Sequence, residues 1–202
     1  MQIAERVHIT FRNIAAGDTI VNEGDACELL ICSLSGTVCM EERCDDGSYF
    51  FREYFTTPIV LQPERLFGLR PRHSATFTAE TDTQILVIPK AEVREILFQC
   101  VPFHINYLNI VCSKQHLWES KLWHPLPSTL EQRFTHCLLQ RSTRPAGKKA
   151  LTIDMIGLAS ELLTTRLRVS QMLNALKDLG LIELRRRNIT IPSLEQLIQH
   201  TQ

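Results

Sequence analysis

Residues 153–191 constrain the fold more than any other part of the sequence. Ile153–Leu162 and roughly Thr165–Leu179 carry apolar residues at helical spacing, and very few residues separate the two stretches. Gly180 follows, at a position where helix C-termini favour glycine. Because two helices joined by a short turn form a helix-turn-helix, the sequence predicts that motif here.

Two short apolar stretches follow the second helix, and both predict β-strands. They are Leu181–Leu184 and residues 188–192, and Arg185–Arg187 lie between them. A β-hairpin with three arginines at its tip, directly after a helix-turn-helix, is typical of the winged variant of this motif.

The second helix has an apolar face and a polar face when its residues are placed at helical intervals. The apolar face consists of Val169, Met172, Leu173 and Leu176. On the other face, arginine can pair with guanine, glutamine with adenine, and an apolar side chain with a thymine methyl group. Threonines before the helix can cap it while its amides approach a phosphate. The candidate DNA-binding residues are Thr164, Thr165, Arg166, Leu167, Arg168, Ser170, Gln171, Asn174, Arg185, Arg186 and Arg187. A solvated face in an unrelated helical bundle is the alternative.

The charge distribution supports two modules. Residues 1–122 hold 11 basic and 16 acidic residues, a net charge of −5, whereas residues 123–202 hold 11 basic and 6 acidic residues, a net charge of +5. A basic C-terminal part favours a polyanionic partner such as double-stranded DNA.

The first half of the chain reads as short strands separated by turns. Turn residues recur at Ala16–Asp18, Glu23–Asp25, Ser35–Gly36 and Asp45–Gly47, with apolar and β-branched residues between them. This pattern predicts a compact antiparallel sandwich or barrel. The glycine-rich motifs of dinucleotide-binding and P-loop folds do not occur in the sequence.

After Pro89 the pattern becomes helical, with helices expected at Glu92–Cys100 and Val101–Trp123. Apolar residues recur at intervals of seven in the second helix, as in a short coiled coil between two copies of the chain. The candidate dimer-interface residues are Val101, Ile105, Leu108, Val111, Cys112, Gln115, Trp118 and Leu122. Alternatively, the helix packs only on its own domain.

The remaining residue patterns argue against several other classes of protein. The seven cysteines include no CxxC pair; an iron–sulfur cluster at Cys27, Cys32, Cys39 and Cys44 is one interpretation, and buried or reduced thiols are the favoured one. No metal site is expected, and neither HxH, HExxH nor a nucleophile–base pair marks an enzyme. An apolar signal segment and a membrane-spanning run are also missing, so we expect a cytoplasmic protein without a membrane partner.

Over nearly its whole length the chain resembles the Crp/Fnr family of bacterial transcription regulators. Residues 14–25, IAAGDTIVNEGD, and Leu34–Gly36 resemble the glycine-punctuated start of a cyclic-nucleotide-binding β-roll. Residues 158–173, LASELLTTRLRVSQML, resemble the family's helix-turn-helix signature. The resemblance implies an α+β fold: an N-terminal antiparallel β-roll (a double-stranded β-helix, jelly-roll-like), a long dimerisation helix and a C-terminal winged helix-turn-helix. It also implies a non-enzymatic, homodimeric, sequence-specific DNA-binding regulator that contacts RNA polymerase.

The recognition helix departs from the family pattern. That helix commonly runs Ser-Arg-Glu-Thr-Val-x-Arg, and of the three base-contacting positions only Arg166 is kept; Leu167 and Gln171 replace the other two. The glycine usual in the turn is Leu163. We therefore expect DNA binding with a different operator sequence.

The sensor departs further from the family pattern. Members that bind cyclic nucleotides carry Gly-Glu at a short helix and, about ten residues later, an arginine beside Ser-Ala. Here Phe67-Gly68-Leu69 is the nearest match to Phe-Gly-Glu, and His73 stands where that arginine is expected. We expect no cofactor and no binding of cyclic AMP in the usual way. The candidate residues for another anionic effector are Arg65, Arg70, Arg72, His73 and Ser74, unless this segment is only a solvated loop.

The expected domains are a sensor β-roll at 1–99, a dimerisation helix at 100–123 and a winged helix-turn-helix at 124–202. The leading function is a homodimeric regulator that reads an inverted-repeat operator. The alternative is a ligand-sensing or protein-interaction module of the same fold that has lost operator recognition.

Overall fold

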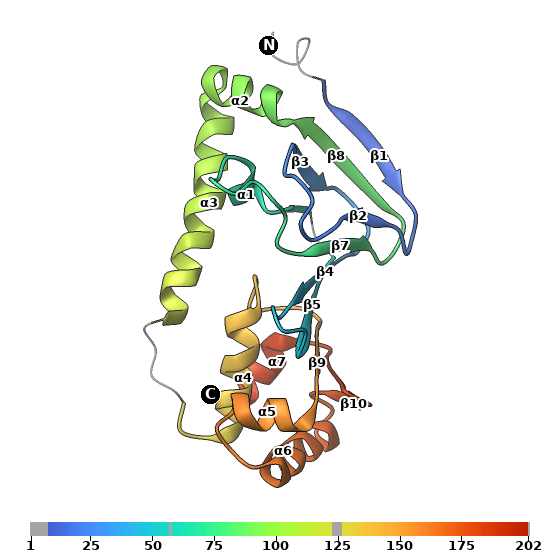
Figure 1. Cartoon of the computed structure of the whole chain (residues 1–202), viewed down its shortest axis with the longest axis vertical. Helices are drawn as coiled ribbons and strands as arrows, with labels where there is room; N and C mark the ends of the chain where they lie inside the picture. The colour runs from blue at the N-terminus through green and yellow to red at the C-terminus, as the bar shows by residue number, and fades with distance from the viewer. Residues whose placement is uncertain (1–7, 57, 123–126, 202) are drawn as a thin grey trace. The chain divides into compact units, whose positions relative to one another are not determined.

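The computed structural model describes residues 8–56, 58–122 and 127–201 (Figure 1). The chain forms two compact units, residues 1–40 with 55–122 and residues 41–54 with 123–202. The elements are β1 (Thr10–Ile14), β2 (Thr19–Val21), β3 (Leu29–Ser33), β4 (Val38–Arg43), β5 (Tyr49–Phe55), β6 (Ile59–Val60), α1 (Pro63–Leu66), β7 (Thr76–Ala79), β8 (Thr83–Pro89), α2 (Lys90–Gln99), α3 (Val101–Leu122), α4 (Leu130–Arg141), β9 (Lys149–Ile153), α5 (Met155–Glu161), α6 (Arg166–Asp178), β10 (Glu183–Arg185), β11 (Asn188–Ile191) and α7 (Leu194–Thr201).

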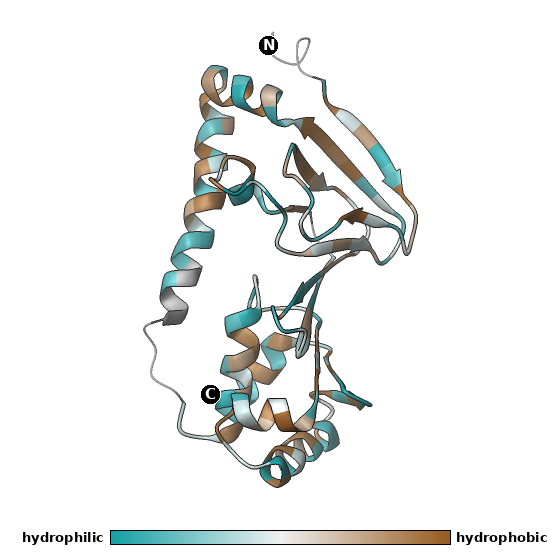
Figure 2. Cartoon of the chain, in the orientation of Figure 1, coloured by the Kyte–Doolittle hydropathy of each residue, from teal (hydrophilic) through white to brown (hydrophobic). Residues whose placement is uncertain are grey.

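The first unit is built on antiparallel strands, as the sequence predicted. One sheet has the strand order β1-β8-β3-β6, and β4, β7 and β2 are neighbours in a second sheet. Strand β8 pairs with β1 on one side and with β3 on the other. The hydrophobic core between the two layers contains Ile31, Val38, Met40, Phe55, Leu61, Ala75, Phe77, Ile85 and Val87. Figure 2 shows how strongly apolar β3 and β8 are.

Because side chains alternate along a strand, β3 and β8 also present apolar residues to the opposite face. Leu30 and Ile88 lie in a second core with Leu66 of α1 and with Val93 and Ile96 of α2. Phe103 and Tyr107 of α3 pack against this core. The long helix is therefore anchored on the sensor by one of its faces.

The second unit combines a sheet with four helices. Strands β10, β11, β9 and β5 are neighbours in this order, and all of these neighbours pair in antiparallel fashion. The core of the unit contains Phe134, Leu138, Leu158, Leu162, Val169, Leu173, Leu176, Ile191, Leu194 and Leu197. Phe51 of β5 lies in this same core, with 1% of its surface exposed. Residues from the N-terminal part of the sequence are thus part of the C-terminal unit, whereas we expected a boundary at 123/124.

A buried ion pair fixes β5 in the second unit. Glu53 pairs with Lys149 in the register of β5 and β9, and their side chains are 0% and 1% exposed. Lys149 Nζ donates to Glu53 Oε1 at 2.7 Å and to the carbonyl oxygen of Ala146 at 2.7 Å. The backbone amides of Thr143 and Arg144 also donate to the Glu53 carboxylate, at 2.7 and 2.9 Å. Burying two charges costs little only when such contacts are complete.

Some elements differ from the sequence predictions. The helix expected from Ile153 begins at Met155, because Ile153 ends strand β9 and Asp154 caps the helix. Strand β9 was not predicted: the basic segment Thr143–Lys149 reads as a loop, and only its last residue belongs to the strand. Helices α1 and α7 were not predicted either. The apolar spacing of Leu126, Leu130, Phe134, Cys137 and Leu138 predicts a further helix that ends near Ser142. Leu126 lies outside the described residues, and α4 begins at Leu130 after a capping box of Thr129 and Gln132.

No single helix of the described ranges is long and apolar enough to cross a membrane. Helix α2 and residues 101–116 reach that length and apolar composition only together, and the two helices are bent by 116° where they meet.

We expect Glu53→Ala to lower the free energy of unfolding by about 3–5 kcal/mol, because the buried ammonium of Lys149 loses its partner. Glu41→Ala is the matched control on the same hairpin: Glu41 pairs with the exposed Arg43 and the half-buried Arg52, which both reach solvent, and its loss should cost at most about 1 kcal/mol. Urea unfolding followed by circular dichroism measures both. Equal losses of unfolding free energy in the two variants would show that the buried pair stabilises the protein no more than the surface pair does.

Leu163, between α5 and α6, has a left-handed backbone with φ of 52° and a side chain that is 69% exposed. A left-handed residue with a Cβ costs about 1–2 kcal/mol, so Leu163→Gly should stabilise the protein by about 1 kcal/mol. Leu179→Gly is the control, because Leu179 is 59% exposed but has right-handed helical φ and ψ. It should destabilise by about 0.5–1 kcal/mol. Thermal unfolding distinguishes them, and a loss of stability in both would contradict the prediction.

Candidate functional site

Helices α5 and α6 form the predicted helix-turn-helix. Asp154 caps α5 by accepting hydrogen bonds from the amides of Ile156 and Gly157 at 3.0 and 2.7 Å. Thr165 caps α6, because its hydroxyl accepts from the amide of Arg168 at 3.4 Å. The caps set where each helix begins, so the first turn of α6 has a fixed direction.

The two faces of α6 are those that the sequence predicted. Val169, Met172, Leu173 and Leu176 are buried. On the other face Thr165, Arg166, Leu167, Arg168, Gln171 and Asn174 are exposed, and Thr164 and Ser170 are half-buried. Leu167 is 68% exposed, although an apolar side chain gains nothing from contact with water. The structure thus places arginine, leucine and glutamine side chains side by side on one accessible helix surface.

The wing is the two-stranded hairpin of β10 and β11. Arg185 pairs with Asn188, so Arg186 and Arg187 form the turn, and Arg187 has a left-handed φ of 60°. All three arginines are exposed. The guanidinium of Arg187 lies 3.8 Å from Asp154, which links the wing to the start of α5.

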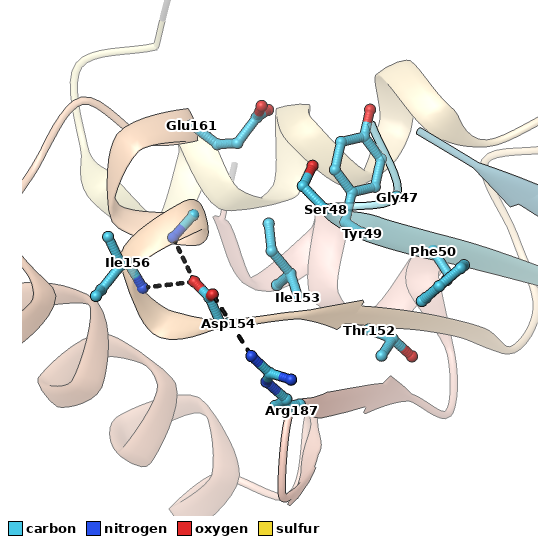
Figure 3. A pocket seen from close by; sticks show the side chains of 11 residues that line it. Gly47, Ser48, Tyr49, Phe50, Thr152, Ile153, Asp154, Ile156, Glu161 and Arg187 are labelled. Atoms are coloured by element: carbon cyan, nitrogen blue, oxygen red, sulfur yellow. Dashed lines mark hydrogen bonds and ion pairs between the residues drawn. The ribbon is translucent and has the colours of Figure 1, made fainter. Parts of the chain in front are cut away.

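A hollow of about 400 Å³ lies beside this link (Figure 3). Residues 47–50 of the hairpin line it together with Thr152–Asp154, the start of α5, Glu161 and Arg187. Its carboxylates already have partners: Asp154 caps α5, and Glu161 pairs with Arg141 at 2.6 Å. The two carboxylates of the hollow are therefore engaged within the protein.

The sensor site differs from the predicted one. Arg70 and Arg72 are exposed, Arg65 is half-buried, and Arg72 donates to the carbonyl oxygen of Gly24 at 2.8 Å. His73 is buried instead, and Ser74 is half-buried beside it. The structure thus joins His73 and Ser74 in one polar cluster but leaves Arg70 and Arg72 at the surface.

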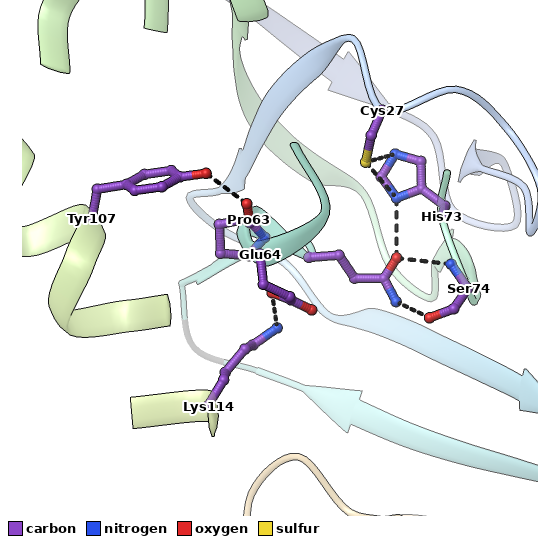
Figure 4. A network of polar contacts seen from close by, with 8 residues as sticks. Cys27, Pro63, Glu64, His73, Ser74, Tyr107 and Lys114 are labelled. Carbon is purple, nitrogen blue, oxygen red and sulfur yellow. Dashed lines mark hydrogen bonds and ion pairs between the residues drawn. The ribbon is translucent and has the colours of Figure 1, made fainter. Parts of the chain in front are cut away.

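Two residues that the sequence analysis missed complete this polar cluster (Figure 4). Cys27 Sγ lies 3.2 Å from His73 Nε2, and Gln62 Oε1 lies 3.2 Å from His73 Nδ1. Because an amide oxygen can only accept, Nδ1 carries the proton and Nε2 accepts from the thiol. Burial lowers the pKa of His73 and raises the pKa of Cys27, so both side chains are neutral at pH 7.

The short helix of the sensor is α1, which spans Pro63–Leu66 and ends directly before Phe67-Gly68-Leu69, the segment that we had matched to the family's Phe-Gly-Glu. Pro63 at the first helical position favours this start. Gln62 and Pro63 therefore stand where Gly-Glu was expected, and His73 follows Pro63 by ten residues. With this placement of the helix, the spacing to His73 equals that of the family pattern, and the departure lies in the residue types.

Helix α3 keeps an exposed apolar face. Val101, Ile105 and Leu108 are 70%, 51% and 43% exposed, whereas Phe103 and Tyr107 pack against the sensor core. Cys112 and Gln115 are exposed and Val111 is half-buried; the side chains of Trp118 and Leu122 lie outside the described residues. One face of the helix therefore packs on its own domain, while the other face is exposed. Pairing of the exposed face with a second copy stays a prediction.

The four cysteines considered for a cluster do not lie in one environment. Cys27 and Cys39 are buried, and Cys32 and Cys44 are half-buried. Among the residues that the structure describes, no group of three or more His, Cys, Asp or Glu side chains could hold a metal ion.

Two family models match the chain, and each covers one of its parts. The model for cyclic nucleotide-binding domains matches residues 11–100, and the model for Crp-like helix-turn-helix domains matches residues 132–200. Among curated proteins, none matches this sequence.

Solved structures share the fold at low sequence identity. FixK2 from Bradyrhizobium japonicum is 18% identical with a TM-score of 0.53, over 96% of this chain and 97% of FixK2. The c-di-GMP responsive regulator CLP of Xanthomonas campestris is 17% identical with a TM-score of 0.54, over 94% and 95%. A Crp/Fnr regulator from Eubacterium rectale is 22% identical with a TM-score of 0.51, over 98% and 90%. With both family models in the same order as the two structural parts, the chain belongs to the Crp/Fnr family of DNA-binding transcription regulators.

Proposed function

We propose that this regulator is a homodimer that reads an inverted-repeat operator and that its sensor holds no cyclic nucleotide. The observation that carries the first part is the exposed face of α6, where arginine, leucine and glutamine side chains lie beside a wing with three arginines. An exposed leucine among such groups gains free energy when it contacts a thymine methyl in the major groove. The cytoplasm is where such a protein meets its DNA.

The residues of α6 and the wing divide the work. Gln171 can pair with adenine and Arg166 with guanine, so these side chains contribute sequence preference. The hydroxyl of Thr165 caps the amide of Arg168, and the amides of Arg166 and Leu167 can approach a phosphate. Arg185–Arg187 neutralise phosphate charge without reading bases. The positioning contacts and the base contacts are therefore carried by different residues.

The exposed apolar face of α3 supports pairing of two copies. Val101, Ile105 and Leu108 would be removed from water by a second α3, which is the main source of free energy for such an interface. Two recognition helices related by a twofold axis read half-sites about 34–36 Å apart. The family resemblance further implies contact of the DNA-bound dimer with RNA polymerase.

The residues of the sensor cluster do not suit a cyclic phosphate. A buried anion needs a cation and several amide donors, because an unpaired buried charge is very costly. His73 is buried and neutral, Pro63 has no amide hydrogen to donate, and the amide of Ser74 already donates to Gln62 at 3.1 Å. None of the four side chains of the cluster therefore carries a positive charge, and neither Pro63 nor Ser74 offers a backbone amide to the ligand.

Selection of random double-stranded DNA by the full-length protein tests the function. We expect an inverted repeat with half-sites one helical turn apart. Gln171→Ala should relax one base position in each half-site at a cost of about 1–3 kcal/mol. Leu108→Glu places a charge on the exposed α3 face and should reduce binding to that of a single half-site.

Fluorescence anisotropy on the selected DNA gives the affinities, and sedimentation gives the oligomeric state. Arg186→Ala is the control for Gln171→Ala, because it should weaken binding to all sequences alike and flatten the salt dependence. A monomer whose DNA binding ignores Leu108→Glu would contradict the dimer. Failure to enrich any sequence would favour the module without operator recognition.

Titration calorimetry tests the sensor. We expect no saturable binding of cyclic AMP or cyclic GMP tighter than about 10 μM, because the cluster offers no cation to the phosphate. The same titration includes cyclic di-GMP, the effector named for the Xanthomonas regulator of similar fold. Tight binding of a cyclic mononucleotide would show that the cluster opens and that this part of the proposal is wrong.

A further inference from the structure

Gln62 connects the sensor strands to α1 with an unusual set of contacts. Its side chain is buried, with only 5% of the residue exposed. Its Nε2 donates to Ser74 Oγ at 2.8 Å, and its Oε1 accepts from the amide of Ser74 at 3.1 Å. The same Oε1 faces His73 Nδ1 at 3.2 Å. One carboxamide thus satisfies three polar groups of the segment that leads into β7.

The backbone of Gln62 is held in an uncommon conformation to make these contacts. It lies in the left-handed region, with φ of 41° and ψ of 52°, directly before Pro63. A residue with a Cβ adopts that region at a cost, so the surrounding contacts must offset it. The carbonyl oxygen of Gln62 also accepts from the amide of Arg65 at 3.0 Å, which closes the first turn of α1.

Helix α1 is in turn fastened to α3. The hydroxyl of Tyr107 donates to the carbonyl oxygen of Pro63 at 2.6 Å, and Lys114 pairs with Glu64 at 2.9 Å (Figure 4). The ring of Tyr107 also meets Phe67 edge-on, with centroids 6.1 Å apart. Burial raises the pKa of Tyr107 to about 12, so the phenol remains a donor over the whole useful pH range.

We propose that the side chain of Gln62 takes the place of an effector in the sensor. It is a positioning residue that holds α1, and through α1 the helix α3, in the conformation used for DNA binding. The contacts run unbroken from Ser74 through Gln62 and α1 to Tyr107 and Lys114. A free ligand in this cluster would have to displace a side chain that is already tethered and desolvated. The effect on DNA rests on the proposed function, whereas the effect on α3 does not.

Gln62→Gly in the full-length protein is the direct test, because glycine adopts the left-handed conformation without strain and only the side chain is lost. We expect faster hydrogen exchange in residues 101–116 of α3 and about tenfold weaker binding to the selected DNA. Propionamide has the atoms of the missing side chain and should restore both. Propanol, of similar size without the amide, should restore neither, and neither compound should change the unmodified protein.

Three controls separate the outcomes. Gln171→Ala should weaken DNA binding and leave exchange in α3 unchanged; if the unmodified protein binds no DNA, the exchange measurement still decides the role of Gln62. Unchanged exchange in Gln62→Gly, or equal rescue by propanol, would overturn the proposal. If the glycine variant does not fold, Gln62→Glu and Gln62→Met replace it. The Gln62→Glu variant keeps the hydrogen-bond acceptor, so its DNA affinity should be within about threefold of that of the original protein. The Gln62→Met variant should bind DNA about tenfold more weakly. Equal DNA affinities of the two variants would refute the role of Gln62.

Discussion

The structure of the second unit depends on the contact between Glu53 and Lys149. Their side chains are almost fully buried, so each would be very costly without the other. Three donors meet the Glu53 carboxylate, two of them backbone amides of residues 143 and 144 that follow α4. This contact joins β5 to β9 and brings Phe51 into the core of the helix-turn-helix. The DNA-binding part of the chain is therefore discontinuous in sequence.

Local sequence patterns predict the elements whose residues lie within one segment. The faces of α6, the two strands of the wing, and α3 follow from apolar spacing within each segment, and the structure confirms them. Local patterns do not predict β9 or its pairing with β5, because the partners of the buried pair are 96 residues apart and nothing near Lys149 distinguishes it from an exposed lysine. A lysine at the end of a basic loop reads as solvated until its partner is known.

In the sensor, too, contacts between distant residues could not be predicted from the sequence. The departure at His73 was visible in the sequence, but Gln62 carried no signal, because glutamine is ordinarily exposed and becomes buried here only through Ser74 and His73. The short helix was misplaced because Phe67-Gly68 matched the family's Phe-Gly, whereas Pro63 determines where α1 begins. Gln62 stands where the family has glycine, and its side chain fills space that the glycine leaves open.

The discontinuous unit also changes the meaning of the charge distribution. Segment 41–54 brings Arg43 and Arg52 but five acidic residues to the second unit, which then holds 13 basic and 11 acidic residues, a net charge of +2 rather than +5. Bulk attraction to DNA is correspondingly small. Affinity must come instead from the local placement of the arginines of α6 and the wing, where each phosphate contact adds to the salt dependence. We therefore expect this regulator to bind non-specific DNA weakly, and the proposed base contacts of Leu167 and Gln171 would then matter more for the choice of operator.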